Sequence, residues 1–537
     1  MVIYLLLVAV IMFACVLFNR ISSKYGIPML FAFILLGMFF GTDGVGKIDF
    51  SDYDTTEQIC SIALIFIMFY GGFGTKWSEA KPIAAKAIIL SSVGTIATAG
   101  LVGLFCFLVL KIEVLESFLI GSVIASTDAA SVFSILRSKK LNLRYNNASL
   151  LEVESGSNDP FSYMLTIIIL SLMKNGEVKA GQFIYMLFSQ VVFGVILGFL
   201  IAGLALFILK RFKFGSSGFD TIFIIAISIL SYALTTLIGG NGYLSVYITG
   251  IILGNSKIPN KQILVNFFDG ATGLCQMILF FLLGLLSFPS KLPGVAFIGL
   301  MIALFLTFVA RPIAVSLILI PFKSKLKEIT LVSWCGMRGA ASIVFAIMAV
   351  SAKNNGFINI NNDIFHIVFF IVLFSILLQG GLLPFMSRKL DMIDVDSDVM
   401  KTFTDYSDEF PIQFLQFRMV ATHPWVNKPL STIVLPPESI LVLLIRDNEK
   451  IIPNGKTVIH ENDLVILSGK ASEQINGIHL YEKTIKKGDE WLNKSIATIK
   501  EEDKLIIVIK RKKNIVIPKG STILKEGDIL VINNPIN

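Results

Sequence analysis

Long apolar runs, separated by short polar connections, dominate the first 390 residues of the chain. A membrane-spanning helix needs about 20 mostly apolar residues, and runs of this kind recur throughout this region. They predict thirteen spanning segments, at residues 2–18, 27–42, 59–75, 83–110, 115–137, 147–171, 183–209, 219–238, 241–254, 264–287, 295–320, 328–351 and 363–386. The first run lacks the basic start and the cleavage site of a signal peptide, so we expect it to remain as the first span.

Basic residues alternate between the predicted connections. The odd-numbered connections, together with the stretch after the last span, contain 19 Lys and Arg residues, whereas the even-numbered connections contain six. Cytoplasmic loops of membrane proteins carry the excess of Lys and Arg. The alternation therefore predicts an outside N-terminus and a cytoplasmic location for everything after residue 387, and it favours the count of thirteen spans.

The composition excludes several classes of protein. The 537 residues are 54% hydrophobic and only 16% charged, against roughly 25% charged in soluble domains. This excludes a purely cytosolic enzyme, a disordered regulator and a fibrous protein. The net charge of +8 divides into +10 for residues 1–390 and −2 for residues 391–537, so the basic excess is an orientation signal and not a nucleic-acid-binding face. The five cysteines lie in apolar segments without paired spacing, so we expect neither a disulfide nor a metal framework.

The residues after 390 have the composition of a soluble α+β module. Residues 391–412 are polar and acidic, which is typical of a linker. Two similar stretches follow, and the segments that begin at Trp425 and Trp491 align at an offset of 66 residues. A repeat of this length indicates a duplicated small domain, here residues 413–472 and 473–537. Alternating β-branched residues, bounded by Gly-containing turns, predict strands and hairpins.

Ionisable side chains inside the apolar spans are where function should be sought. At membrane depth each of them costs at least about 2.5–3.5 kcal/mol on insertion scales, so each requires a partner or a role. Those well inside the predicted spans are Asp128, Glu152, Glu154, Asp159, Arg311 and Arg338. We give most functional weight to Asp128, Asp159 and Arg338, because they are central.

The sixth predicted span places several oxygen ligands on neighbouring turns. Glu154 and Asn158 are four residues apart, as are Ser155 and Asp159, so each pair shares a helix face. Pro160 has no N–H, so it should release a backbone carbonyl and bend the helix beside the carboxylate. Oxygens of this kind hold hard cations, whereas thiolate and imidazole ligands are absent. The pattern predicts a site for a monovalent cation.

Two other spans contain small and polar residues around a central charge. They are the fifth span, around Asp128, and the twelfth span, around Arg338. Such composition predicts helices that are interrupted at mid-membrane, with unwound backbone lining a cavity. Paired interruptions in the two halves of a chain indicate an inverted-repeat transporter with a midplane site. Asp128 and Arg338 would then neutralise helix ends, and for Asp128 we favour this role.

A single buried carboxylate at position 159 can carry out an exchange. Either a proton or a cation can neutralise it, and occupancy by one excludes the other. If only a neutralised site can cross the membrane, this competition couples the two fluxes. Asp159 is therefore the residue that we expect to carry the transport reaction.

Three motifs taken together resemble the monovalent cation/proton antiporter superfamily, in its NhaP-like branch. They are Ser126-Thr-Asp-Ala, Glu154-Ser-Gly-Ser-Asn-Asp and Gly336-Met-Arg-Gly-Ala. The resemblance implies an all-α polytopic membrane domain with about thirteen helices, arranged as an inverted repeat with two broken crossing helices. It also implies a transporter that is not an enzyme, and alternating access by movement of a core bundle against a dimerisation domain. The expected oligomer is a homodimer.

The resemblance also implies roles for individual residues. Those that match the family's cation- and proton-binding positions are Asp159, Asn158, Ser155, Thr127 and Asp128. K⁺ or Na⁺ would bind at Asp159, Ser155 and Thr127, and Glu154 looks like the ion-pair partner of Arg338. The Asn-Asp pair resembles the electroneutral members, which exchange one ion for one. One departure is Ala129, which occupies a place that is often Pro.

The tail resembles two consecutive RCK_C (TrkA_C) domains. Residues 391–537 contain no GxGxxG motif, so we expect no nucleotide-binding Rossmann partner. The resemblance implies a small anionic regulator, cyclic di-AMP in some bacterial cases, and no other cofactor. Positive groups that could receive a phosphate are Arg418, His423, Lys428 and Arg446, although an ordinary solvated surface explains each of them equally well. By analogy alone, a potassium-linked tail favours K⁺ over Na⁺.

Three classes of function remain open. The leading hypothesis is an antiporter of a bacterial-type plasma membrane that exports K⁺ or Na⁺ against H⁺ under control of the tail. A channel gated by the tail is the second, but it requires a carbonyl-lined filter such as Thr-Val-Gly-Tyr-Gly, which this sequence does not contain. The third is a membrane sensor that moves no ion, for which buried Asp and Arg residues would serve no purpose.

Overall fold

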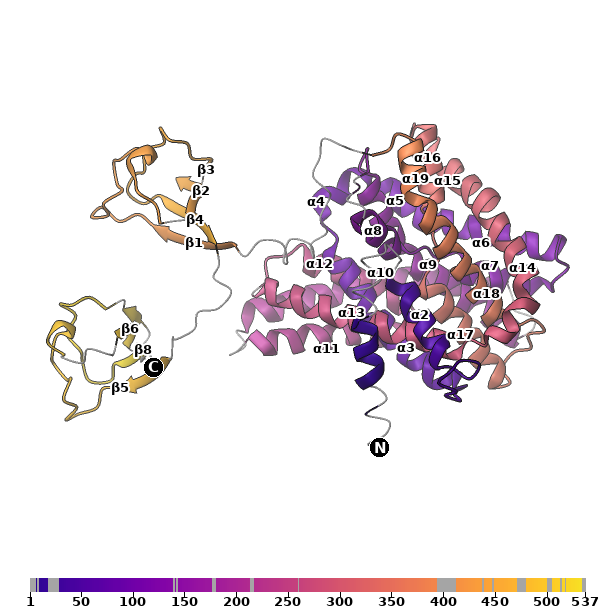
Figure 1. Ribbon diagram of the computed structural model, residues 1–537, viewed down its shortest axis with the longest axis horizontal. Coiled ribbons are helices and arrows are strands. Elements are labelled where there is room, and N and C mark those ends of the chain that lie inside the picture. The colour runs from indigo at the N-terminus through magenta and orange to yellow at the C-terminus, as the bar shows by residue number, and fades with distance from the viewer. Residues whose placement is uncertain are drawn as a thin grey trace. The chain divides into compact units, whose positions relative to one another are not determined.

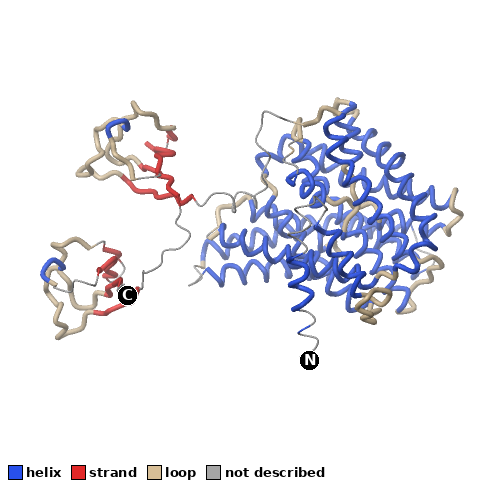
Figure 2. The backbone as a smooth tube through the Cα atoms, viewed as in Figure 1, coloured by secondary structure: helices blue, strands red, loops and turns tan. Residues whose placement is uncertain are grey.

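The computed structural model divides the chain into two compact units, Met1–Ser407 and Asp408–Asn537. The first is helical and the second is built from strands (Figures 1 and 2). The residues that the structure describes are 6, 9–17, 29–138, 141, 143–175, 180–212, 217–258, 260–393, 412–436, 439–446, 449–470, 480–499, 505–511, 514–516 and 518–533.

The first unit begins with a helical stretch at residues 9–17. The helices after it are α2 (Met29–Phe40), α3 (Tyr53–Gly74), α4 (Trp77–Ala80), α5 (Ala84–Ile89), α6 (Thr95–Leu108), α7 (Val114–Val123), α8 (Ala129–Ser138), α9 (Asn147–Asn175), α10 (Ala180–Arg211), α11 (Ser217–Leu237), α12 (Gly242–Gly254), α13 (Lys261–Leu286), α14 (Leu292–Phe305), α15 (Arg311–Leu319), α16 (Leu326–Trp334), α17 (Ala340–Asn354), α18 (Ile364–Phe374) and α19 (Gly381–Lys389).

By length and composition, seven helical runs among the described residues can cross a membrane. They are Tyr53–Gly74, Lys81–Leu108, Gly181–Arg211, Gly218–Leu237, Lys261–Leu286, Pro289–Leu319 and Ile364–Lys389. Large apolar side chains on them, such as Leu200 and Leu317, are more than 60% exposed, as expected where lipid replaces water. The chain is therefore an integral membrane protein. Thirteen spans remain a prediction, because several of the helices are shorter than these or carry buried charges.

Two helices are interrupted, as the sequence predicts. Helix α7 ends at Val123 and α8 begins at Ala129, while α16 ends at Trp334 and α17 begins at Ala340. The two unwound segments touch, because the N–H of Asp128 donates to the carbonyl of Met337 at 2.8 Å. This confirms the expectation of two broken helices that cross.

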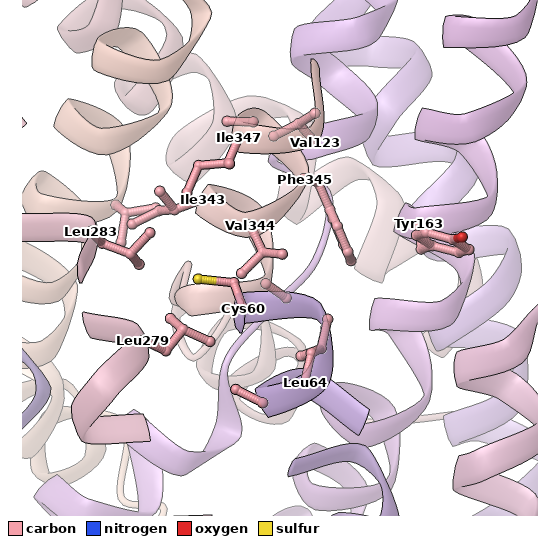
Figure 3. Close-up of a cluster of buried hydrophobic side chains, with 14 of the residues drawn as sticks. Cys60, Leu64, Val123, Tyr163, Leu279, Leu283, Ile343, Val344, Phe345 and Ile347 are labelled. Carbon is pink, nitrogen blue, oxygen red and sulfur yellow. The ribbon is translucent and has the colours of Figure 1, made fainter. Parts of the chain in front are cut away.

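Helix α9 packs against both α7 and α5, so the helix that carries Asp159 lies inside the unit. An apolar cluster covers one side of it (Figure 3). The members labelled there are Cys60, Leu64, Val123, Tyr163, Leu279, Leu283, Ile343, Val344, Phe345 and Ile347. Tyr163, a member of this cluster, follows Asp159 by one helical turn on α9. All five cysteines are free thiols.

The chain after α19 is fastened to the loop between α8 and α9. Leu143 and Ile393 form an antiparallel β-bridge, and the N–H of Arg144 donates to the carbonyl of Met392 at 2.9 Å. The guanidinium of Arg144 also pairs with the carboxylate of Asp391 at 3.1 Å. Met392 is 1% exposed and belongs to the core formed by α8, α9 and α16. We call residues 391–393, paired with 143–144, the clasp.

The second unit contains two four-stranded antiparallel sheets. Their strands are β1 (Ile412–Arg418), β2 (Ser439–Arg446), β3 (Glu449–Ile451), β4 (Leu464–Lys470), β5 (Leu480–Thr484), β6 (Leu505–Arg511), β7 (Asn514–Val516) and β8 (Ile529–Asn533). The strand order is β1-β4-β2-β3 in one sheet and β5-β8-β6-β7 in the other, so the repeated sequence forms the same sheet twice. The described residues add one short 3-10 helix to each repeat.

Candidate functional site

Charged side chains complete the ends of the half-helices at the crossing. Asp128 precedes α8, and its carboxylate accepts hydrogen bonds from the hydroxyl and the N–H of Ser131. Arg338 donates from Nη1 to the carbonyls of Ala125 and Ser126, at 2.6 and 2.8 Å, just after α7. An anion at a helix N-terminus and a cation at a C-terminus compensate the helix dipole. Asp128 and Arg338 are therefore placed to neutralise the partial charges at the ends of the two half-helices.

Asp159 lies where α9 meets the unwound segment after α7. It is 8% exposed, and its carboxylate accepts a hydrogen bond from the hydroxyl of Ser126. The amide of Asn158 donates to the hydroxyl of Thr127 and accepts from its N–H. Ser155 donates to the carbonyl of Thr127 at 2.7 Å. The residues predicted for the cation site therefore lie together, although helix and segment are about 30 positions apart in the chain.

The site is rich in oxygen and nearly buried. Hydroxyl and amide oxygens surround the carboxylate of Asp159. Oxygen atoms are the ligands that alkali cations prefer. The sequence alone does not reveal that Ser126, the first residue of the Ser126-Thr-Asp-Ala motif, contacts the carboxylate. Its position between the helix end and Thr127 was the available signal.

The buried ion pair differs from the expected one. Glu154 binds Arg311, whose Nη2 donates to both carboxylate oxygens at 2.8 and 2.9 Å, and each side chain is 1% exposed. This corrects the expectation that Glu154 pairs with Arg338. The guanidinium of Arg338 donates instead to the carbonyls that follow α7. The absence of a side chain at Gly336 leaves room for Arg311, because a Cβ at position 336 would lie 2.7 Å from Nε of Arg311.

A residue that the sequence did not reveal supports the carbonyl next to Asp159. Asn241 precedes α12 and donates from Nδ2 to the carbonyl of Pro160 at 2.6 Å. Its Oδ1 accepts from the N–H of Leu244, and its own N–H donates to the carbonyl of Gln190. Asn241 thus fixes α9 to the start of α12 directly beside the carboxylate. A polar residue after Gly239-Gly240 in an apolar region was the signal.

In the tail, the residues proposed to receive a phosphate differ in their surroundings. Arg446 donates to both carboxylate oxygens of buried Asp463, at 2.9 and 2.8 Å, so its guanidinium serves the interior of its own domain. Its assignment as a phosphate contact stays a prediction. Arg418 and Lys428 are exposed. His423 accepts from the N–H of Trp425.

The fold and the site define a membrane transporter in which two unwound helices meet a buried carboxylate. Comparison with known proteins identifies the family of transporters to which the chain belongs. The chain belongs to the sodium/hydrogen exchanger family of transporters, because the family model described as "Sodium/hydrogen exchanger, transmembrane" matches residues 6–389. The TrkA-C domain model matches residues 414–475 and 480–532 of the tail.

Several relatives are similar over most of this chain. The K(+)/H(+) antiporter NhaP2 of Shewanella sp. (strain MR-4) is 30% identical over 472 residues, which are 87% of this chain and 81% of the relative. The K(+)/H(+) antiporter NhaP of Alkalimonas amylolytica is 31% identical with the same coverage. The solved structure of the sodium proton antiporter MjNhaP1 from Methanocaldococcus jannaschii at pH 8 superposes with a TM-score of 0.64 at 25% identity. It covers 72% of this chain and 99% of that chain.

Proposed function

We propose that the protein is a secondary active antiporter that exchanges a monovalent cation for H⁺ across a bacterial-type plasma membrane. The observation that carries the proposal is the contact of Asp159 with the unwound segment between α7 and α8. A carboxylate held there can be neutralised by one proton or by one cation, but not by both at once. Antiport follows if the site can switch between its outward-open and inward-open states only when Asp159 is neutralised by a proton or a cation.

The charges at the crossing favour an electroneutral exchange. Three carboxylates lie there, on Asp128, Glu154 and Asp159, together with the guanidinium groups of Arg311 and Arg338. With every group ionised the cluster has one negative charge in excess. One proton or one monovalent cation makes it neutral, and a neutral cluster is the form that crosses a low-dielectric region at least cost.

K⁺ is the favoured cation and Na⁺ the alternative. The relatives from Shewanella and Alkalimonas, which are named K(+)/H(+) antiporters, align over 87% of this chain. The relative named Na(+)/H(+) antiporter 1, from Methanocaldococcus jannaschii, aligns over 61%. The longer alignment supports K⁺. Ser155 and Thr127, with Asp159, are the residues proposed to hold the ion, while Asn158 and Asp128 shape the site.

The tail is proposed to be cytoplasmic and regulatory, with the N-terminus outside. The distribution of Lys and Arg supports this orientation. The clasp supports regulation, because it joins the start of the tail to the loop that leads into α9. We further propose a homodimer through the membrane domain and the tail. Cyclic di-AMP is the proposed regulator, with Arg418, His423, Lys428 and Arg446 as its proposed phosphate contacts.

Everted membrane vesicles test the proposal. A proton gradient is established and followed with acridine orange, and KCl, NaCl or LiCl is added. Salt-induced dequenching in the wild type, abolished in Asp159→Asn, is the expected result. Passive current without proton movement would indicate a channel instead, and no response to any salt would indicate a sensor.

A matched variant controls for loss of folding. Asp220 on α11 is also a buried aspartate, 5% exposed, and accepts a hydrogen bond from Asn260 outside the site. Asp220→Asn should retain exchange. The assay is repeated with cyclic di-AMP and with the tail deleted after Ile393, which leaves the clasp in place. Equal loss of exchange in both Asp→Asn variants would contradict the assignment of Asp159.

A further inference from the structure

Tyr247 on α12 reaches the turn of α9 that precedes Asp159. A Cβ added at Gly156 would lie 2.9 Å from both Cε2 and the hydroxyl oxygen of Tyr247, so only glycine leaves room for this side chain. The backbone of Tyr247 is equally confined, because a Cβ at Gly72 of α3 would lie 2.3 Å from its carbonyl oxygen. The ring is therefore held against α9 by close packing on two sides.

The hydroxyl of Tyr247 has no hydrogen-bond partner among the described residues, although the residue is only 3% exposed. The hydroxyl of Thr75, which also lies in this region, donates to the carbonyl of Gly71 at 2.9 Å. Buried hydroxyl groups almost always have a partner, because an unpaired one is costly. The working protein should therefore bring a partner to this oxygen.

A second oxygen lies on the same turn of α9. Pro160 has no N–H, so position 160 cannot make the usual helical hydrogen bond to the carbonyl of Gly156. Gly156 is also partly exposed, whereas its neighbours Ser155 and Ser157 are buried. A carbonyl oxygen and a hydroxyl oxygen thus lie at the turn of α9 that precedes Asp159.

We propose that the hydroxyl of Tyr247 and the carbonyl of Gly156 coordinate the monovalent cation as it approaches or leaves Asp159. This inference rests on the proposed antiport and deepens it. Oxygen atoms that replace water around a monovalent cation set both its affinity and its selectivity. Tyr247 is then a specificity-determining residue, contributed by a helix outside the unwound crossing. A proton needs no such oxygen shell, so removing the hydroxyl affects the cation alone.

The test compares Tyr247→Phe with Tyr243→Phe. Tyr243 is the matched control, because it lies one turn earlier on α12, is 1% exposed and also has an unpartnered hydroxyl. Its ring packs against Tyr163 and Tyr232, at 4.8 and 4.9 Å between centroids, and not against Gly156. Both substitutions keep the aromatic ring and its packing, so the variants differ only in which hydroxyl is removed.

Exchange in everted vesicles is measured over a range of KCl and NaCl concentrations. Tyr247→Phe should raise the KM for K⁺ about five-fold, the loss expected for one ligand of this type, with a different factor for Na⁺ and an unchanged maximal rate. Tyr243→Phe should match the wild type. An unchanged KM in Tyr247→Phe, or the same increase in both variants, would overturn the proposal.

A second measurement separates this inference from the proposed function. Thermal unfolding of the purified full-length protein in detergent is followed in KCl and in choline chloride at equal ionic strength, since a bound cation stabilises the folded state. The wild type should be stabilised by K⁺, and Tyr247→Phe less so at the same concentration. If the wild type fails to exchange ions but shows this difference, antiport is wrong and the cation contact stands. Equal K⁺ stabilisation of both proteins overturns the contact.

Discussion

Glu154 on α9 and Arg311 at the start of α15 form a bidentate ion pair, with N–O distances of 2.8 and 2.9 Å. The pair joins the helix that carries Asp159 to a helix 157 positions later in the chain. Both side chains are almost completely buried. Loss of one partner therefore leaves a charge in a low-dielectric environment with nothing to balance it.

Arg311→Met should destabilise the protein by about 3–5 kcal/mol, because Glu154 remains buried and unpaired. The measurement is the thermal unfolding midpoint of the purified protein in detergent. Adding Glu154→Gln to Arg311→Met should recover much of the loss, since the unpaired charge is then removed. A double variant less stable than Arg311→Met alone would contradict this account.

Asp128→Asn should retain cation-dependent proton movement, in contrast to Asp159→Asn. The reason is that Asp128 caps α8 through Ser131. The amide oxygen of an asparagine can still accept from the N–H of Ser131, and its NH₂ group can donate to the Ser131 hydroxyl. The loss of charge at the helix N-terminus should cost about 0.3–1 kcal/mol of stability. Vesicle exchange and thermal unfolding are measured together. Complete loss of exchange at wild-type stability would assign Asp128 to the cation instead.

The stability of the second tail repeat should fall in acid. Hydrogen bonds from Arg511 hold the pKa of Asp528 below its usual value, although burial acts in the opposite direction. Because the folded state favours the carboxylate, the pair stabilises the repeat above the unfolded pKa of about 3.9. This contribution is lost as the pH falls through the lower folded pKa. Hydrogen exchange of peptides from β6 and β8, corrected for intrinsic rates, should show protection decreasing below about pH 4.

Asp528→Asn provides the control for this pH dependence. It should lower protection of β6 and β8 already at pH 7, because Arg511 keeps its charge without a carboxylate. The first repeat, with its own Arg446 and Asp463 pair, should retain wild-type protection in the same molecule. Wild-type protection of the second repeat in Asp528→Asn at pH 7 would show that the pair contributes nothing.

Two truncations should differ in stability although they are only five residues apart. Deletion after Arg388 removes Met392, which is 1% exposed, together with the bridge between Leu143 and Ile393. Loss of a buried Met side chain costs about 2–5 kcal/mol. Deletion after Ile393 retains these contacts and should unfold close to the wild type. Equal unfolding temperatures would show that the clasp does not stabilise the membrane unit.

The sequence predicts the interrupted helices well, because the physical signal is local. Small and hydroxylated residues surround Asp128, and glycines flank Arg338 at positions 336 and 339. The same local reasoning predicts strands at 439–446 and 504–511, where the structure has β2 (Ser439–Arg446) and β6 (Leu505–Arg511). Alternating apolar positions between turn residues are sufficient for this.

Pairings between distant helices are not encoded by the local sequence, and the predicted ion pair between Glu154 and Arg338 is wrong for this reason. The choice of Arg311 over Arg338 as the partner of Glu154 depends on how α15 packs and on the space left by Gly336. The contact of Asn241 with Pro160 joins positions 81 apart. Hydropathy identifies Arg311 and Asn241 as polar residues within apolar segments. It contains no information about which backbone or side-chain group each of them contacts.

The polypeptide returns to the helix bundle at Ile393 before it continues into the tail. A displacement of the tail's first residues must therefore act on Leu143 and Arg144, which lie within four positions of the start of α9 at Asn147. Twelve residues further along that helix is Asp159. Force applied from outside the bundle thus has a short covalent route to the ion-binding carboxylate, and the two need not touch for one to control the other.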